Sequence, residues 1–449
     1  MPGFTVGTLL RPRENYKSSR RQCDQINARF IKRILNVGFK TVPFVGIPGP
    51  NLAQQGLCFR FTFLIRRSNP EDGHDGYFTS MTLQEKTLHP EKFQRCMVLA
   101  GGGFRFGLYL GMYAAARETG NAPDVVLASC GGAIAASMIG ATADPAEQRA
   151  LLEAPEMYRF WQQIKSTRSA GILRAIGNAA RRRFSRRPAP VVPDLFNDYL
   201  FEVPPLLPFP ATQGNSEVSI AIVGGRLLFD QAQVGQARAG RKLFAEAVFC
   251  DVRSAALLQG MRSPFADARW GDHAIAEQLL LETGTPSGVA ARISIADMFY
   301  FRCVEHASGH YIGGVVDLFP IELARTLADR VMIEFKQSFD QTYSIPAWRS
   351  VLGLDGNLRL RQVNGQPVDF RFDTSDISDA LATQATSKKL DWLHNRIGLA
   401  NPASYELYRQ YMRAQWQYGY ERAMEAFRRH EPYRESTMRQ VDRHSRGCA

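Results

Sequence analysis

The chain has 449 residues, of which 45% are hydrophobic and 22% are charged. This length allows two or three domains, and the composition is that of a folded globular protein, which excludes a disordered chain and a membrane bundle. The formal net charge of +12 favours anionic partners such as phospholipid surfaces, nucleic acid or acidic proteins, but charge alone does not choose among them.

The seven cysteines are scattered, and none of them are spaced as a metal-binding pair. Free thiols in a reducing compartment explain them most simply, and the sequence indicates no metal and no organic cofactor. Residues Met1 to Arg13 contain no apolar core of signal-peptide length. The longest nearly apolar run, from Val125 to Ala141, is too short for a membrane span. We therefore expect a cytoplasmic protein.

The first 92 residues are predicted to form an N-terminal extension. A basic amphipathic stretch at residues 23–39 predicts a helix. Two strand-like runs, residues 58–66 and 77–83, flank a segment rich in turn formers. These two runs predict a β-hairpin.

From Cys96 onward, apolar strands alternate with helical stretches, which is typical of a parallel sheet covered by helices. The first strand ends in Gly101, Gly102 and Gly103, and a helical run follows. Glycines turn sharply and leave their N–H groups unobstructed, and a helix start adds a positive end, so this loop is expected to bind an anion. An oxyanion hole and a phosphate loop both fit, although no Lys-Ser/Thr pair follows to support the nucleotide interpretation.

The next strand is followed by a tight turn and a helix rich in small residues. The turn consists of Ala128, Ser129, Cys130, Gly131 and Gly132. Such an elbow lifts its middle residue, Cys130, out of the sheet with its side chain exposed. Because a helix start favours negative charge, we expect a lowered pKa for this thiol, as a nucleophilic cysteine requires. The alternative is a small cysteine kept for packing.

The stretch from Arg168 to Arg187 is the most basic part of the chain, with apolar residues such as Ile172 among its arginines. It can bind an anionic membrane peripherally, or it can be a solvated helix with a linker. No zinc spacing or RNA-binding aromatic signature accompanies the charge, so no nucleic-acid partner is expected. The sequence does not indicate an oligomeric state.

Residues 331–449 are predicted to form a third, largely helical region. Asn401 with Pro402 after it is expected to begin a long helix. A stripe of large side chains on one face of this helix is expected to pack into the core. The stripe consists of Tyr405, Tyr408, Met412 and Trp416.

The glycine loop and the elbow together resemble the patatin-like phospholipases, whose loop reads G-G-G-x-R-G and whose elbow reads G-x-S-x-G. Here Arg105 matches the loop arginine, Phe106 replaces its last glycine, and Cys130 replaces the serine. Two later blocks resemble the family's A-R-A-S-S-A-x-P and D-G-G-x-x-D-N-x-P motifs. They run from Ala291 to Met298 and from His310 to Pro320.

The resemblance implies an α/β fold over residues 93–330, namely a three-layer α/β/α sandwich with a mostly parallel central sheet. It also implies an acyl lipid or acyl thioester substrate and an oxyanion hole beside the elbow. The residues that match this hole are Gly101, Gly102, Gly103, Arg105 and Gly131.

The general base is the point at which this chain departs from the family. The family pairs its elbow serine with the aspartate of D-G-G, and Ile312 stands at that position and cannot accept a proton. His310 is the first candidate base because it shares a strand face with residue 312, and Asp317 is the second. For Asp297, His306 and Glu305 the sequence offers no reason beyond proximity.

Two functions remain open on the sequence. The first is an acyl hydrolase or acyltransferase that works through a Cys130 acyl thioester. The second is a catalytically degenerate patatin-fold protein that binds lipid or membrane as a scaffold, which the loss of the D-G-G aspartate favours.

Overall fold

A computed structural model describes residues 62–66, 78–82, 90–184, 191–209, 217–307, 309–339, 344–384 and 386–445. The chain forms two compact units, Met1–Thr87 and Leu88–Ala449. In the first unit, β1 (Thr62–Arg66) and β2 (Phe78–Thr82) pair antiparallel and lie within the two runs that predict a hairpin. The basic helix predicted at residues 23–39 lies outside the described residues.

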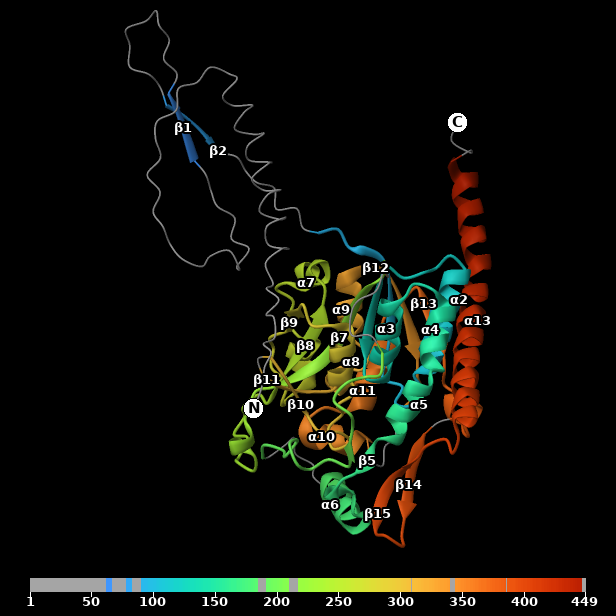
Figure 1. The fold of residues 1–449 in the computed structure, drawn as a ribbon. Helices are drawn as coiled ribbons and strands as arrows, with labels where there is room; N and C mark the ends of the chain where they lie inside the picture. The colour runs from blue at the N-terminus through green and yellow to red at the C-terminus, as the bar shows by residue number, and fades with distance from the viewer. Residues whose placement is uncertain are drawn as a thin grey trace, which may run out of the picture. The chain divides into compact units, whose positions relative to one another are not determined.

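Within the described part of the second unit, nine strands form one mixed sheet (Figure 1). Its order is β10-β11-β7-β4-β3-β12-β13, and β8 and β9 join it through β7. The strands from β7 to β13 pair parallel, whereas β8, β11 and β10 are added antiparallel. The bounds are β3 (Phe93–Leu99), β4 (Val125–Ser129), β7 (Ser219–Leu227), β8 (Phe244–Cys250), β9 (Leu280–Thr283), β10 (Val304–His306), β11 (Gly309–Ile312), β12 (Ala328–Phe335) and β13 (Phe370–Asp373).

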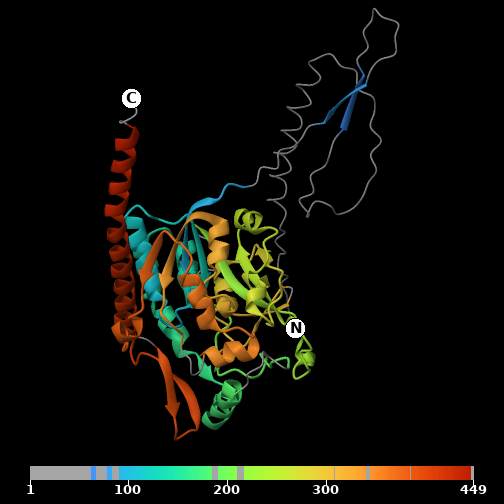
Figure 2. The same ribbon diagram turned by 180° about the vertical axis from the view of Figure 1, so that it is seen from behind.

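Helices cover both faces of this sheet (Figures 1 and 2). One face carries α2, α3, α8 and α13, and the other carries α7, α9 and α11. This arrangement confirms the predicted α/β/α sandwich. The helices are α2 (Gly107–Glu118), α3 (Gly131–Ala141), α4 (Pro145–Leu152), α5 (Pro155–Gln162), α6 (Ile172–Phe184), α7 (Val252–Leu258), α8 (Ser287–Ser294), α9 (Ile321–Leu327), α10 (Ser344–Val351), α11 (Gly356–Asn364), α12 (Ile377–Ala380) and α13 (Tyr405–Ser445).

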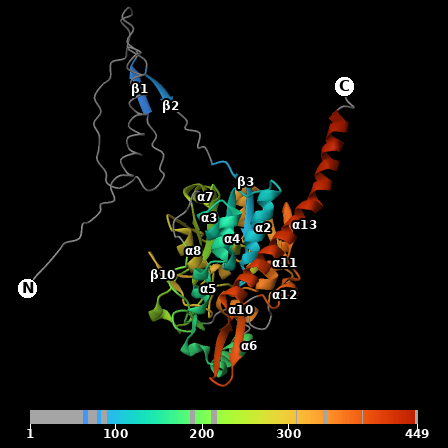
Figure 3. The same cartoon turned by 45° about the vertical axis from the view of Figure 1, so that its right-hand side comes forward.

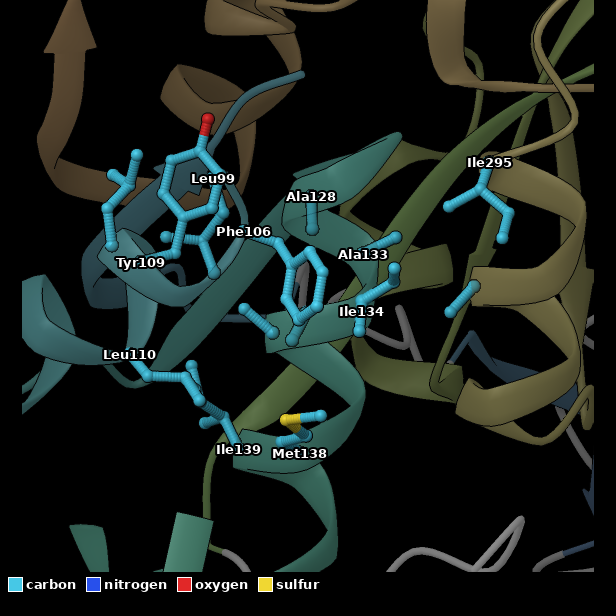
Figure 4. Close-up of a cluster of buried hydrophobic side chains, with 14 of the residues drawn as sticks. Leu99, Phe106, Tyr109, Leu110, Ala128, Ala133, Ile134, Met138, Ile139 and Ile295 are labelled. Carbon is cyan, nitrogen blue, oxygen red and sulfur yellow. The ribbon is translucent and has the colours of Figure 1, made fainter. Parts of the chain in front are cut away.

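Strand β3 shows why the sequence needs cover on both faces. Cys96 and Val98 belong to one buried cluster, and Met97 and Leu99 belong to the cluster on the opposite face. Because neighbouring residues of a strand point to opposite faces, an unbroken apolar run requires helices on both sides. Figure 4 shows part of the cluster that contains Met97 and Leu99, where Leu99 lies near apolar side chains of α2 and α3.

The C-terminal helix α13 lies along α2 in every view (Figures 1 and 3). A Cβ atom on Gly111 of α2 would stand 1.9 Å from the carbonyl oxygen of Trp416, so only glycine permits this backbone contact. Tyr408 and Met412 are buried in the core, as the stripe on this helix predicts.

The start of α13 corrects the sequence expectation. The helix begins at Tyr405, and the Ser404 hydroxyl accepts a hydrogen bond from the backbone N–H of Leu407. Asn401 does not cap the helix, because its side-chain amide instead donates to the carbonyl oxygen of Trp161. Ser404 therefore takes the capping role expected of Asn401.

The residues after 330 do not fold separately from the sheet. Strands β12 and β13 complete its edge, and the boundary expected after residue 330 falls inside β12. Two small additional sheets are β5 (Lys165–Ser166) with β6 (Phe201–Glu202), and β14 (Ser387–Asp391) with β15 (Arg396–Ala400). Among the residues described here, no helix is both long enough and apolar enough to cross a membrane.

Candidate active site

The predicted elbow lies between β4 and α3. Cys130 adopts φ 48° and ψ −122°, a strained conformation for a residue with a side chain. Its backbone N–H donates to the Ser294 hydroxyl at 2.8 Å, and that hydroxyl donates to the carbonyl oxygen of Val223 at 2.6 Å. The Ser129 hydroxyl donates to the backbone carbonyl oxygen of Asp317. These bonds from neighbouring elements hold the elbow in place.

The polar partner of the thiol is Asp297, a residue for which the sequence offers no argument beyond proximity. The Cys130 Sγ donates to Asp297 Oδ2 at 3.2 Å. Asp297 follows the end of α8, where its backbone carbonyl accepts from the N–H groups of Tyr300 and Phe301 and so begins a turn. A Cβ atom on Gly313 would stand 2.5 Å from Asp297 Oδ1, so the missing side chain at position 313 leaves room for this carboxylate.

Both members of this pair have raised pKa values. Burial raises the pKa of the Asp297 carboxyl to about 7, and the hydrogen bond from the thiol offsets only part of this effect. Burial, and after it the Asp297 carboxylate, raise the pKa of the Cys130 thiol well above its ordinary value. The start of α3 and the charge of Lys336 lower it by less. The expectation of a thiol with a lowered pKa is therefore wrong, because Cys130 is only 6% exposed.

The glycine loop lies directly against the elbow. A Cβ atom on Gly131 would stand 2.5 Å from the carbonyl oxygen of Gly103, so the backbones of loop and elbow are in contact. Gly103 has φ +58°, which turns the chain between β3 and α2. Among the described residues, the backbone N–H groups of Gly102 and Gly103 have no hydrogen-bond acceptor. The loop therefore offers free donors beside the thiol, as an oxyanion hole requires.

Two side chains from later in the chain, after β12 and on α13, hold the glycine loop. Lys336 Nζ donates to the carbonyl oxygen of Gly101 at 2.7 Å and pairs with Glu334 at 3.3 Å. Gln415 of α13 accepts from the N–H of Gly107 at 3.1 Å and donates to the carbonyl oxygen of Phe104 at 3.3 Å. Sequence reasoning missed both residues, since only the packing of β12 and α13 brings them to the loop.

A cavity of about 240 Å³ opens over the thiol. Cys130, Asp297, Gly101, Gly103 and Gly131 contribute its polar part. The rest of the wall is apolar and mostly aromatic. It consists of Phe104, Ile134, Trp161, Ile295, Tyr300, Phe301, Leu318, Phe339 and Trp348. Such a wall excludes water and accepts an apolar group next to the sulfur.

The structure does not bring His310 to the thiol. His310 pairs with Glu305 across the β10–β11 hairpin, and its ring packs edge-on against Phe196 with centroids 5.1 Å apart. It is not among the residues that line the cavity. Ile312, at the position of the family aspartate, is 1% exposed and pairs with Gly225 of β7.

Asp317 has a different partner. Its Oδ2 accepts from Arg359 Nη2 at 2.8 Å, and its Oδ1 accepts from the backbone N–H of Phe319. Arg359 also pairs with Glu322 at 2.6 Å. Both residues of the Asp317–Arg359 pair are buried, so this aspartate is committed to a structural ion pair.

The remaining predicted residues do not line the cavity. Ala128 is buried in the core, and a Cβ atom on Gly132 would stand 2.1 Å from the carbonyl oxygen of Leu99. The elbow therefore packs tightly against the end of β3. Arg105 does not line the cavity, and its guanidinium interacts electrostatically with Tyr418 of α13. Its predicted part in the oxyanion hole is not supported by this position.

Other thiols in the described residues lack a comparable setting. Cys96, Cys250 and Cys303 are buried, and none of them lines the cavity. Burial raises the pKa of both Cys96 and Cys250 to about 12. In the same part of the chain, no group of three or more His, Cys, Asp or Glu side chains could hold a metal ion.

The site thus combines a thiol on an elbow, a glycine loop with free backbone donors and a carboxylate at the wall of one cavity. The sequence model of the family described as "Patatin-like phospholipase" matches residues 97–325, just over half of the chain. The chain therefore belongs to the patatin-like phospholipase family, whose members are generally hydrolases of lipid esters. This match confirms the resemblance seen in the loop, the elbow and the two later blocks.

Comparisons with individual proteins add little. No curated protein matches this chain. Among solved structures, the crystal structure of VipD from Legionella pneumophila is similar, with 12% sequence identity over 84% of this chain and 72% of that one. The TM-score of this pair is 0.29, so the likeness carries no weight here.

Proposed function

We propose that this chain is an acyl hydrolase or acyltransferase in which Cys130 is the nucleophile and Asp297 is the general base. One observation carries the proposal: Cys130 Sγ lies 3.2 Å from Asp297 Oδ2 at the wall of an apolar cavity. The family's serine–aspartate pair is replaced by a cysteine and an aspartate from a different segment. The acid lost at Ile312 is thus supplied by the turn after α8.

The first half-reaction forms an acyl-enzyme. Asp297 accepts the thiol proton as Sγ bonds to the substrate carbonyl carbon, and negative charge develops on the carbonyl oxygen. The free N–H groups of Gly102 and Gly103 stabilise this charge. The bond from the carbonyl carbon to the leaving group then breaks, and protonated Asp297 gives its proton to that group.

The second half-reaction releases the acyl group. Water or an acceptor hydroxyl gives its proton to the Asp297 carboxylate while its oxygen bonds to the carbonyl carbon. The bond from that carbon to Sγ breaks, and the proton returns to the sulfur. Water as the acceptor makes the protein a hydrolase, and an alcohol acceptor makes it an acyltransferase.

The raised pKa of the Asp297 carboxyl suits this cycle. A carboxyl group whose pKa is about 7 can both accept and return a proton near neutral pH. A thiol is also a far stronger acid than an alcohol, so a weaker base suffices for cysteine than for serine. The neutral thiol and the carboxylate therefore form a resting pair that activates only when an acyl group occupies the cavity.

Intact-mass spectrometry of the full chain tests the proposal. After a short incubation with p-nitrophenyl butyrate, the wild-type protein should gain the mass of one butyryl group, and peptide mapping should place it on Cys130. The label should be absent in Cys130→Ala. Cys96→Ala is the matched control, because this buried thiol lies away from the cavity and its loss should leave the label in place.

The competing function is a scaffold that binds lipid without turnover. It is favoured by Ile312 at the position of the family aspartate and by the occupied carboxylate of Asp317. An unlabelled Cys130, together with saturable binding of a fatty acid to the wild-type cavity, would support the scaffold and overturn the proposed chemistry.

A further inference from the structure

The large apolar side chains exposed in the described residues gather at one place. Half of the ten most prominent ones lie on two segments, the start of α6 and the β14–β15 hairpin, which we call the hairpin patch. Its members and their exposed fractions are Leu173 (73%), Ile176 (53%), Leu390 (49%), Trp392 (67%) and Leu393 (90%). The other exposed apolar side chains are scattered over separate segments. A concentration of this kind marks an interaction site.

The two segments of the hairpin patch are joined. The backbone N–H of Ile172 donates to the carbonyl oxygen of Asn395 in the hairpin turn at 3.3 Å, and Gly171 forms a β-bridge with Arg396. Figures 1, 2 and 3 show α6 and the hairpin together at the same end of the unit. The patch is therefore one surface, although its two segments are far apart in sequence.

Basic residues surround the apolar tip. Residues 168–184 carry five arginines and no acidic residue, and residues 387–400 carry three basic residues and one acidic residue. Arg168, Arg174, Lys388, Lys389 and Arg396 are exposed. Part of the basic stretch, residues 185–187, lies outside the described residues, as do the side chains of Arg181, Arg182 and Arg183.

The patch adjoins the cavity over Cys130. The ammonium group of Lys388 lies 4.8 Å from the ring centroid of Tyr300, which lines that cavity. Helix α10, which carries the cavity residue Trp348, packs against α6. A membrane bound at the patch would thus lie near residues that line the cavity.

We propose that the hairpin patch docks this chain on an anionic phospholipid bilayer. Trp392 and Leu393 at the turn enter the boundary between headgroups and acyl chains, where an indole ring and an aliphatic side chain are stabilised. The surrounding lysines and arginines contact lipid phosphates and bind more tightly to membranes with net negative charge. This docking does not depend on the chemistry of Cys130, and it adds the hairpin to a surface for which the sequence indicated only the arginine stretch.

Vesicle co-sedimentation of the full chain tests the proposal. The wild-type protein should bind vesicles of phosphatidylcholine mixed with phosphatidylserine, and added salt should weaken this binding. The double variant Trp392→Asp/Leu393→Asp should bind at least about tenfold less, because two inserted apolar side chains are lost. The double variant Lys389→Glu/Arg396→Glu should lose about as much on mixed vesicles and little on phosphatidylcholine alone.

Val252→Asp is the matched control, because Val252 is 77% exposed and begins α7, at the end of the unit opposite α6 (Figure 1). It should bind mixed vesicles as the wild type does. All variants should keep the melting temperature of the wild type and its rate of hydrolysis of a water-soluble ester. Equal binding by the hairpin variants and Val252→Asp would overturn the proposal, and so would a wild type that does not prefer the anionic vesicles. A failed acyl label on Cys130 leaves this test unaffected.

Discussion

Two aspartates beside the elbow, Asp317 and Asp297, have opposite surroundings. Asp317 is neutralised by Arg359, and both of its oxygens accept hydrogen bonds. Within the part of the chain that the structure describes, Asp297 has a thiol as its side-chain partner, and its Oδ1 has no hydrogen-bond partner. Burial raises the pKa of both carboxyl groups, but at Asp317 the charge of Arg359 opposes this rise, whereas Asp297 lacks such a counter-ion and can gain or lose a proton near neutral pH.

This difference explains why the residue type alone is a poor guide to function. Both aspartates lie close to the elbow, since Ser129 bonds to the backbone of Asp317 and Cys130 to the side chain of Asp297. Only the second can accept a proton from the thiol. This difference can be tested by changing the site of each carboxylate separately and measuring activity and stability in both cases.

The largest expected effect is on activity. Asp297→Asn should lower kcat/KM for an activated ester by about 10²–10⁴-fold, because the general base is lost while the shape of the side chain is kept. Steady-state kinetics measure it. His310→Gln is the control and should stay within about twofold of the wild type, since a residue outside the cavity takes no part in proton transfer. A larger loss in His310→Gln than in Asp297→Asn would reverse the assignment.

The second expected effect is on stability. Arg359→Met should lower the free energy of unfolding by about 3–5 kcal/mol, because it leaves the buried Asp317 carboxylate without its counter-ion. Urea denaturation measures this loss. Arg361→Met on the same helix is the control, because Arg361 is exposed and its loss should cost little. If Arg359→Met were as stable as Arg361→Met, the structural role of this ion pair would be refuted.

The third effect is a pH dependence. Asp297 must be ionised to accept the thiol proton, and its pKa is about 7. The value of kcat/KM should therefore fall about tenfold for each pH unit below 7 and level off above it. This inflection should persist in His310→Gln. A profile that is flat between about pH 5 and 8 would contradict Asp297 as the base.

The same shift has a consequence for stability. Because folding raises the pKa of Asp297 from the ordinary 3.8 to about 7, its protonated form favours the fold, and this stability is lost as pH rises through 7. Asp297→Asn cannot ionise, so its melting temperature relative to the wild type should be higher at pH 8 than at pH 4. From pH 4 to pH 8, the free energy of unfolding of Asp297→Asn relative to the wild type should rise by about 2 kcal/mol or more. Differential scanning calorimetry at the two pH values checks the sign.

The smallest effect sharpens the role of the C-terminal helix. Gln415→Leu removes the hydrogen bonds that α13 makes to Gly107 and Phe104, so the loop amides lose their alignment. We expect kcat/KM to fall about tenfold, less than for the loss of an oxyanion donor itself. Gln417→Leu is the control on the same helix, because Gln417 is exposed and its side-chain amide donates to Glu421 of α13 itself.

The sequence predicted those parts of the molecule whose conformation depends on residues that are close together in the chain. The glycine loop at Gly101 to Gly103 and the elbow at Cys130 each lie within one strand, turn and helix, so their residues dictate their conformation. The sandwich followed from the unbroken apolar strands. The family resemblance added the two later blocks, from Ala291 to Met298 and from His310 to Pro320.

The sequence could not predict what depends on distant packing. Asp297 and Cys130 are separated by 167 positions, and they meet only because α8 packs on α3 and β7. An acidic residue within the small-residue block from Ala291 to Met298 was the available signal. The raised pKa of the thiol was missed for the same reason, since helix position is visible in sequence and burial is not.

The crowding at Gly313 limits what this position can become in related proteins. The first carbon of any side chain there would lie 2.5 Å from Asp297 Oδ1 and equally 2.5 Å from the carbonyl oxygen of Ser294. The Ser294 oxygen belongs to the backbone of α8, so replacing Asp297 would not free this position. A descendant could therefore lose its acid and still be obliged to keep this glycine.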